Sequence, residues 1–474
     1  MIVLTSRQTC LWIHRYTGLL MVVFLIIAGL TGSLLAFHEQ LDDWFNRDLA
    51  YIQASEKPQI AIATLHDEVI ETYPDYKFSS MPTTIDAERS AVFVVDREQG
   101  KQASIAAKPR FQEVYVNPQT GKIIGTRDRE QWAWHNTMYK VFWLHREILL
   151  GDIGKLILGI VSLIWTINCF IGFYLTLPRK SSALKAKRVD NKFGQANSKK
   201  RTSLLKRWLP AWKIRTKTNT FKLNYDLHHA FGLWLWLILF VIAWSSVGFN
   251  LKSVYQPVMQ VVVGLESKED NLAKAKTETK LENIRDAQTK QQSTSSSTLT
   301  TDANKITKAN SIAYLSEQAE IAAQKDGVEI EKLLGMRWIA EDNQWQMRFT
   351  TTKDIGKKGG ASSITVDAGT GKVEKVKFGY NSSFASKTDQ WLATLHMGHI
   401  SLAKSEQLGH LLYQLLLVLI GLAVTTLSAT GAYLWIKGRQ QRLKTKQKAL
   451  LKLNHNQSKL QPEPKHSPLC NDQL

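Results

Sequence analysis

Residues 18–37 read GLLMVVFLIIAGLTGSLLAF, an apolar run without a single charged side chain. A helix of this length crosses about 30 Å of hydrocarbon, so the run is long enough to span a membrane. It is longer than the apolar core of a secretory signal, and no small-residue cleavage site precedes the acidic segment 39–43. We therefore expect a transmembrane helix that stays in the mature protein.

Three further apolar runs follow at residues 153–177, 230–251 and 408–436. None carries Asp, Glu, Lys or Arg in its apolar centre. The sequence thus predicts a membrane α-helical protein with four unbroken spans. A metal or siderophore permease typically shows broken helices or charges within the membrane, so this pattern argues against one.

The basic residues predict the direction of the spans. Residues 178–226 hold 15 Lys and Arg against two Asp, and the tail after Ile436 is also basic. By the positive-inside rule both segments, and so both termini, lie in the cytoplasm of a bacterial inner membrane. The net charge of +20 then reflects topology beside anionic membrane lipid, and a nucleic-acid role is not expected.

The two long loops, 38–150 and 252–405, face the cell exterior in this orientation, and their patterns predict small α+β domains. The expected helices are 62–73 and 312–323, and residues 117–121 form a turn. The expected strands are 91–95, 113–116, 336–339, 345–349 and 363–366. A Lys/Thr/Ser/Gln-rich insertion at 267–310, the loop 178–220 and the tail after about 440 are expected to be disordered.

The chain contains an internal repeat. The motif His14–Leu19 at span one is matched by His228–Leu233 at span three, and the strand and turn at 114–123 are matched at 364–373. Leu-His precedes both span two and span four. A helix, a soluble domain and a second helix are therefore used twice, which predicts a pseudo-twofold axis along the membrane normal.

Histidines occupy equivalent places in this repeat. His14 and His228 lie at cytoplasmic helix starts, whereas His145 and His396 lie at extracytoplasmic ones. A pseudo-twofold axis brings each pair to opposite sides of the bundle axis, where two imidazoles can clamp a planar haem. The three cysteines form no CxxC or CxxCH motif, so covalent haem attachment is not expected. We expect two b-type haems.

Other residues leave this assignment partly open. Several histidines crowd the extracytoplasmic face, and any of them can replace a member of the outer pair. They are His38, His135, His399 and His410. His229 adjoins His228 but points about 100° away on a helix, so both cannot be ligands in the same way. Arg15 and Arg146 follow candidate ligands and can bind haem propionates, or can be ordinary residues of the membrane edge.

The motifs resemble those of the PepSY-associated transmembrane family. They read HRYTGL at 14–19, LHREILLG at 144–151, DLHHAFGLW at 226–234, LHMG at 395–398 and TGAYLW at 430–435. The segments ending at Lys122 and Lys372 resemble PepSY domain endings. The chain departs from the pattern at His229, where Arg is common, at Ile171-Gly172, and in the insertion.

The resemblance implies an iron-regulated inner-membrane oxidoreductase of iron homeostasis. Some members are di-haem ferric-siderophore reductases of the FoxB type, which reduce Fe(III)–siderophore in the periplasm and release Fe(II). No nucleotide or flavin motif is present, so the electron donor is expected to be a membrane quinol or a cytoplasmic reductase. The alternative is a haem-free PepSY regulator, a protease inhibitor or chaperone anchored by four helices.

The fold expected is a four-helix transmembrane bundle with two extracytoplasmic α+β PepSY-like domains, built as an internal repeat. Its predicted parts are helix 1 (8–38), domain 1 (39–135), helix 2 with a pre-helix (136–178), a basic loop (179–222), helix 3 (223–252), domain 2 (253–390), helix 4 with a pre-helix (391–437) and a basic tail (438–474).

Overall fold

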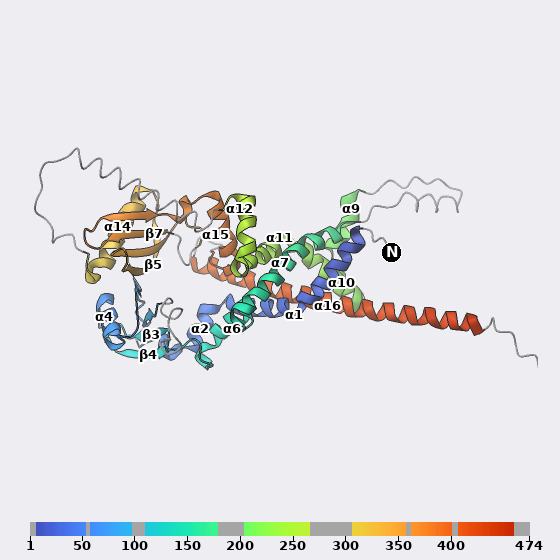
Figure 1. Cartoon of the computed structure of the whole chain (residues 1–474), viewed down its shortest axis with the longest axis horizontal. Helices are drawn as coiled ribbons and strands as arrows, with labels where there is room; N and C mark the ends of the chain where they lie inside the picture. Colours follow the sequence, from blue (N-terminus) through green and yellow to red (C-terminus); the bar gives the residue numbers. More distant parts are fainter. Residues whose placement is uncertain are drawn as a thin grey trace, which may run out of the picture. The chain divides into compact units, whose positions relative to one another are not determined.

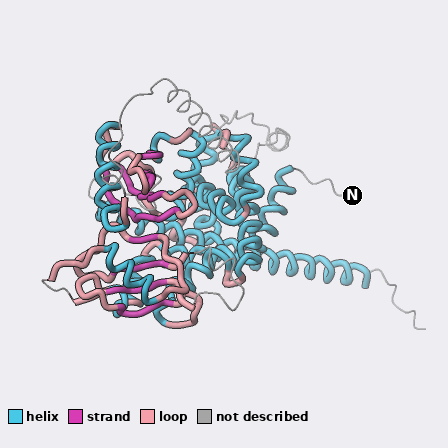
Figure 2. Tube along the Cα trace, turned by 60° about the vertical axis from the view of Figure 1, so that its left-hand side comes forward, coloured by secondary structure: helices cyan, strands magenta, loops and turns pink. Residues whose placement is uncertain are grey.

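The computed structural model describes residues 6–53, 57–96, 110–178, 203–265, 306–356, 362–400 and 406–458 (Figure 1). Most of these residues are helical, and Figure 2 shows the strands between them. The chain divides into two compact units. The helical unit comprises residues 1–26, 167–236 and 423–474, and the sheet unit comprises residues 27–166 and 237–422.

Three helices among the described residues are long and apolar enough to cross a membrane. They are α1 (Ser6–Leu35), α7 (Gly151–Thr176) and α16 (Glu406–Ser458). A fourth span results if α10 (Thr220–Trp234) and α11 (Trp236–Asn250) are counted together. The protein is thus a multi-pass membrane protein with three or four candidate spans, at the positions of the four apolar runs.

The third span is not the continuous helix that the sequence predicts. α10 and α11 meet at Leu235 with a bend of 72°. Gly232 lies nearly one turn before the break, and glycine is a poor helix former. The Trp236 indole donates to the carbonyl of Cys169 on α7 at 2.9 Å, which fastens the first residue of α11 to a neighbouring helix. The expectation of unbroken spans was wrong, and it no longer argues against a permease.

The sheet unit contains two antiparallel sheets, ordered β1-β5-β6-β7-β8 and β2-β3-β4. The strands are β1 (Ser80–Met81), β2 (Ala91–Val94), β3 (Glu113–Val116), β4 (Ile123–Arg127), β5 (Ile330–Ile339), β6 (Gln344–Thr351), β7 (Ser362–Asp367) and β8 (Val373–Lys377). Strand β1 comes from the first loop but pairs with β5 of the second, with Ser80 opposite Arg337. Strand pairing therefore joins the two soluble segments.

One hydrophobic core serves both of these segments. Helix α4 (Ile62–Thr72) contributes Leu65, and α14 (Lys308–Lys325) contributes Leu315. They belong to the same cluster of buried side chains as Phe93 and Met347 of the two sheets. Each helix buries its apolar stripe against a sheet, which is the ordinary way for such elements to form a core.

Short helices link the spans to the sheets. They are α2 (His38–Phe45), α3 (Arg47–Ala50), η2 (Trp134–Asn136), α6 (Thr137–Glu147), α12 (Lys252–Val263), η4 (Gly379–Asn381) and α15 (Phe384–Met397). Helix α6 ends four residues before α7, and α15 precedes α16.

The predicted helices and strands of the soluble loops are present, with β5, β6, β7 and α14 longer than expected. The predicted turn at 117–121 also forms, with Gly121 at φ +75° and the Asn117 carboxamide oxygen accepting from two backbone N–H groups. Its counterpart at 367–371 has Gly371 at φ +70°. These local predictions are confirmed.

Two segments expected to be disordered are in part helical. Within the basic loop, α9 (Leu204–Trp208) and η3 (Leu209–Trp212) form, because Ser203 caps α9 and Pro210 fits the first turn of η3. Beyond residue 440, α16 continues to Ser458 because this stretch is rich in Lys, Gln and Leu and has no proline. Most of the predicted insertion lies outside the described residues, but Ile306 is buried and α14 begins at Lys308, so its expected end at 310 was wrong.

Candidate functional site

Two of the predicted histidines meet in the helical unit. His14 on α1 and His228 on α10 have ring centroids 6.3 Å apart and ring planes inclined by 69°. They are 214 residues apart in the chain, and the fold brings them together. The structure therefore forms the first predicted pair.

The second predicted pair forms in the sheet unit. His145 at the end of α6 and His396 at the end of α15 have ring centroids 6.2 Å apart and planes inclined by 70°. The two pairs thus share nearly the same spacing and the same inclination. This similarity arises from different sets of helices in different units.

The hydrogen bonds fix which nitrogen of each outer histidine carries its proton. The Thr31 hydroxyl donates to the Ile27 carbonyl at 2.6 Å, so its oxygen accepts from His145 Nδ1 at 3.0 Å. Ser245 likewise donates to its own helix, to the Val241 carbonyl, and its oxygen lies 2.8 Å from His396 Nδ1. Both rings therefore carry hydrogen on Nδ1 and a lone pair on Nε2.

The rings of the inner pair, His14 and His228, also carry hydrogen on Nδ1, but their hydrogen-bond acceptors differ from those of the outer pair. Nδ1 of His228 lies 3.0 Å from the Leu427 carbonyl, which can only accept. Nδ1 of His14 lies 3.2 Å from Asn168 Oδ1, and the Asn168 amide nitrogen donates to Thr17. That second bond sets the orientation of the carboxamide, so its oxygen faces His14 and accepts.

All four histidines are thus fixed as Nδ1–H tautomers with Nε2 left for a ligand. A metal-bound histidine usually donates its other nitrogen to a protein acceptor in this way. Two bonds of about 2.0 Å from a metal ion to imidazole nitrogens, and about 1.1 Å from each nitrogen to its ring centre, give centroids roughly 6.2 Å apart. Both observed pairs have room for one metal ion between the rings.

Each site offers only two imidazole donors, which suits a metal ion whose other ligands come from a bound cofactor. Among the residues that the structure describes, no group of three or more His, Cys, Asp or Glu side chains could hold a bare metal ion. Two trans imidazoles complete the coordination of an iron whose other four positions belong to a planar macrocycle. The residues present therefore fit haem.

Glycines lie beside three of the rings. A Cβ atom at Gly172 or Gly431 would come within 3.2 Å of Cε1 of His14 or His228, and one at Gly32 within 3.1 Å of Cε1 of His145. Such contacts are tighter than nine in ten real Cβ contacts. A Cβ atom at these positions would require the imidazole to move by a few tenths of an ångström.

A family model described as the PepSY-associated TM region matches residues 11–438, which include all four of these histidines. The chain belongs to the PepSY-associated transmembrane family. No curated protein matches it in sequence. The family model spans nearly the whole described chain, from α1 to the part of α16 that follows the last apolar residues.

The other candidate residues of this PepSY-associated protein take different positions. His229 stacks on Tyr225, with centroids 4.2 Å apart. The ring of His38 lies 6.2 Å from that of Tyr139, and the carbonyl of His135 accepts from Asn46. The backbone N–H of His399 donates to Thr394. None of these contacts forms a further histidine pair within the described residues.

The arginines proposed for propionates are placed as follows. Arg15 follows His14 on α1 and is partly buried. The guanidinium of Arg146 lies 5.8 Å from the ring centroid of Phe142, on its own helix. The binding of haem propionates by Arg15 and Arg146 therefore remains a prediction.

Sequence reasoning missed the groups that orient the histidines. Thr31, Ser245 and Asn168 are polar residues within apolar spans, where polar side chains are usually functional. Thr31 follows His14 by 17 residues, and Ser245 follows His228 by the same interval. This shared interval was the signal that could have identified them.

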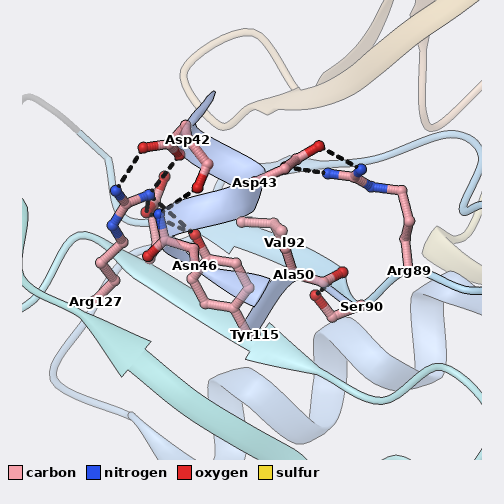
Figure 3. A pocket seen from close by; sticks show the side chains of 10 residues that line it. Asp42, Asp43, Asn46, Ala50, Arg89, Ser90, Val92, Tyr115 and Arg127 are labelled. Atoms are coloured by element: carbon pink, nitrogen blue, oxygen red, sulfur yellow. Dashed lines mark hydrogen bonds and ion pairs between the residues drawn. The ribbon is translucent and has the colours of Figure 1, made fainter. Parts of the chain in front are cut away.

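A separate polar pocket of about 150 Å³ lies beside α2 in the sheet unit (Figure 3). Asp42 accepts two hydrogen bonds from Arg127 of β4, and Asp43 accepts two from Arg89. Arg127 is almost wholly buried, and it also lies over the ring of Tyr139. These pairs hold α2, which directly follows α1, against the smaller sheet.

Proposed function

We propose that this protein is a di-haem b electron-transfer protein of the bacterial inner membrane that reduces Fe(III)–siderophore in the periplasm. The observation that carries the proposal is the presence of two imidazole pairs with centroids 6.2–6.3 Å apart, each ring hydrogen-bonded through Nδ1. Two haems held there would each be six-coordinate and would accept and release single electrons without an open position on iron.

The protein supplies binding and orientation. His14 and His228 would hold one haem, and His145 and His396 the other. The acceptors on Nδ1 keep each ring in the tautomer that can ligate, and they raise its basicity. The glycines beside the rings leave the imidazoles undisturbed.

The repeat proposed from the sequence gives these pairs a common origin. In a four-helix bundle with a pseudo-twofold axis, each pair takes one histidine from each half. The equal spacing of Thr31 and Ser245 from His14 and His228 supports this hypothesis, as does the recurrence of the Asn117 and Asp367 turns.

The orientation proposed from the positive-inside rule places both termini in the cytoplasm. The His14/His228 pair then lies in the half that receives electrons, and the sheets are periplasmic. The PepSY-like sheets would dock the ferric siderophore. One electron converts its Fe(III) to Fe(II), which binds hard oxygen donors more weakly and is released.

The reaction can be tested with purified protein reduced by dithionite and freed of excess reductant. Mixed with a ferric trihydroxamate siderophore in a stopped-flow instrument, the haem α-band should decay as a ferrous chelator captures Fe(II). The gallium(III) complex of the same siderophore has the same shape but cannot be reduced, and it should leave the band unchanged. A band that persists with the iron complex would contradict siderophore reduction.

A further inference from the structure

The described part of the helical unit is almost uniformly positive. It contains 15 Lys and Arg residues and a single acid, Asp226, which is itself paired with Arg215 through two hydrogen bonds of 2.7 Å. Opposite charge within the unit therefore offsets very little of this field. Two of these basic residues, Arg7 and Arg15, lie on α1, and the other 13 fall in two groups, one along the end of α16 and one from α9 to the start of α10.

The first group lies on the extension of α16. After Ile436, the last apolar residue of the span, the helix continues for 22 residues, or about 33 Å at 1.5 Å per residue. Its basic side chains are all exposed, and no acid lies among them. They are Lys437, Arg439, Arg442, Lys444, Lys446, Lys448 and Lys452.

The extension reaches farther than lipid attraction does. Attraction to anionic headgroups falls off within a Debye length, about 8 Å at physiological salt. A helix that continues a span without a break leads away from the bilayer, so most of these charges lie outside that range. Exposed Leu443 and Leu450 lie on one face, seven residues apart, and offer apolar contact area among the charges.

The second group lies next to the inner histidine pair. α9 is fastened to the end of α7, because the Trp208 indole donates to Thr176. Thr176 follows Gly172 by one helical turn, and a Cβ atom built at Gly172 would lie 3.2 Å from Cε1 of His14. Lys222 and His228 are on the same helix, α10. The positive field is thus built around the elements that hold His14 and His228.

We propose that the basic extension of α16, together with the basic residues of α9 and α10, docks an acidic, soluble one-electron carrier protein that reduces the inner haem. This inference rests on the proposed function and on its orientation. Complementary charge steers such a partner and raises the rate of encounter. A quinol is uncharged and enters from the bilayer, so a basic surface would not attract it.

The test uses the full-length haem-loaded protein in neutral phosphatidylcholine nanodiscs, with reduced plant-type [2Fe–2S] ferredoxin as an acidic probe. One variant carries K437Q, R439Q, R442Q, K444Q, K446Q, K448Q and K452Q. A control with equal net charge carries R179Q, K180Q, K185Q, K187Q, R188Q, K192Q and K199Q. Stopped-flow spectra record haem reduction between about 20 and about 200 mM salt.

The wild type should lose about tenfold in rate over this salt range, since screening weakens steering. The α16 variant should be about tenfold slower at low salt and should depend less on salt than the wild type, since only the basic residues of α9 and α10 remain. The control should stay within about threefold of the wild type. Dithionite should reduce all three proteins alike.

Equal rates for the wild type and the α16 variant would overturn the proposal, as would an equal loss in the control. Reduction by duroquinol but not by ferredoxin would favour a quinol donor instead. A loss that appears only in discs with anionic phosphatidylglycerol would show that the helix binds lipid. Failure of the proposed function itself would be seen earlier, as protein that purifies without haem.

Discussion

Each candidate haem ligand donates its Nδ1 proton to a fixed acceptor, and the acceptors differ between the two pairs. Hydroxyls serve His145 and His396, a carboxamide serves His14, and both the Leu427 carbonyl and the Thr430 hydroxyl lie at Nδ1 of His228. These acceptors tune how strongly an imidazole donates to iron. The hydroxyls can therefore be tested apart from the ligands.

Ser245→Ala removes the hydroxyl acceptor from His396, which also has a backbone hydrogen bond to Ile242. We expect the midpoint potential of the outer haem to rise because a less basic imidazole stabilises ferric iron less. Haem affinity should fall by about 10- to 100-fold, the usual cost of losing such a partner. Redox titration of the visible spectrum measures the potential. Ser246→Ala is the control, since its hydroxyl donates only to Ile242 of its own helix at 2.7 Å. Equal potentials in the two variants would contradict the assigned role.

Gly172→Val should displace the His14 ring and remove the inner haem, leaving about one haem per chain. The control is Gly18→Val, because no atom lies within 4 Å of a Cβ built at Gly18. Pyridine haemochrome spectra give the haem content of each. Two haems in the Gly172 variant would show that the glycine has no part in the site.

The sequence predicted the four histidines because the repeat made them stand out. It did not predict Thr31, Ser245 or Asn168, because a hydroxyl or amide in a span commonly bonds only within its own helix. Their second partner, a ring on another helix, becomes visible only once the helices are packed.

At the scale of elements, helix α2 is held by two consecutive Asp–Arg pairs that differ in burial. The side chains of Arg127 and Asp42 are 1% and 18% exposed, whereas those of Arg89 and Asp43 are 36% and 24% exposed. A charge left unpaired costs more where water cannot reach it. The two pairs therefore allow a matched comparison.

Asp42→Ala should lower the free energy of unfolding by about 3 kcal/mol, because it leaves Arg127 buried without its main partner. Asp43→Ala should cost about 1 kcal/mol or less, as exposed pairs do. Thermal unfolding followed by tryptophan fluorescence compares the two variants. A larger effect at Asp43 would refute the assignment of α2 anchoring to Arg127.

Helix α4 carries a buried histidine that makes its stability depend on pH. Burial, and next the charge of Lys308, lower the pKa of His66, whose Nε2 lies 2.7 Å from the Phe78 carbonyl. The unfolded chain therefore binds this proton more readily than the folded one. Stability is full above the ordinary pKa of 6.5 and falls as the pH drops below it.

The sheet unit should accordingly unfold at a lower temperature at pH 5.5 than at pH 7.5. In His66→Gln, which keeps an amide donor for Phe78, this difference should shrink. Differential scanning calorimetry at the two pH values measures it. An unchanged difference in the variant would assign the pH dependence to other groups.

Helices and strands were predicted correctly where the spacing of apolar residues determines the element. The predictions failed where contacts between helices, or the continuation of an existing helix, determine it. Helix α4 and strand β3 follow from apolar spacing alone. The break at Leu235 depends on a contact between Trp236 and α7, which no local pattern reveals. The tail was expected to be disordered for its charge, but its residues are good helix formers that continue an existing helix, so no new nucleus is required.

For the whole molecule, the two soluble segments share one core although a pair of spans separates them in the chain. Leu65 and Leu315 lie in the same cluster, and β1 completes the sheet of the second segment. The sequence predicted an internal repeat but not this shared core, because the pairing of distant strands is not encoded in local periodicity.

The proposed function requires two haem b groups per chain, each between one histidine pair. The most direct measurement is a dithionite-reduced minus oxidised spectrum with haem-to-protein stoichiometry, made on the wild type and on the double variants His14→Ala/His228→Ala and His145→Ala/His396→Ala. We predict two low-spin haems in the wild type and one in each variant. Colourless protein from haem-sufficient cells, or variants that keep both haems, would contradict the proposed function, and the first result would favour a haem-free PepSY regulator.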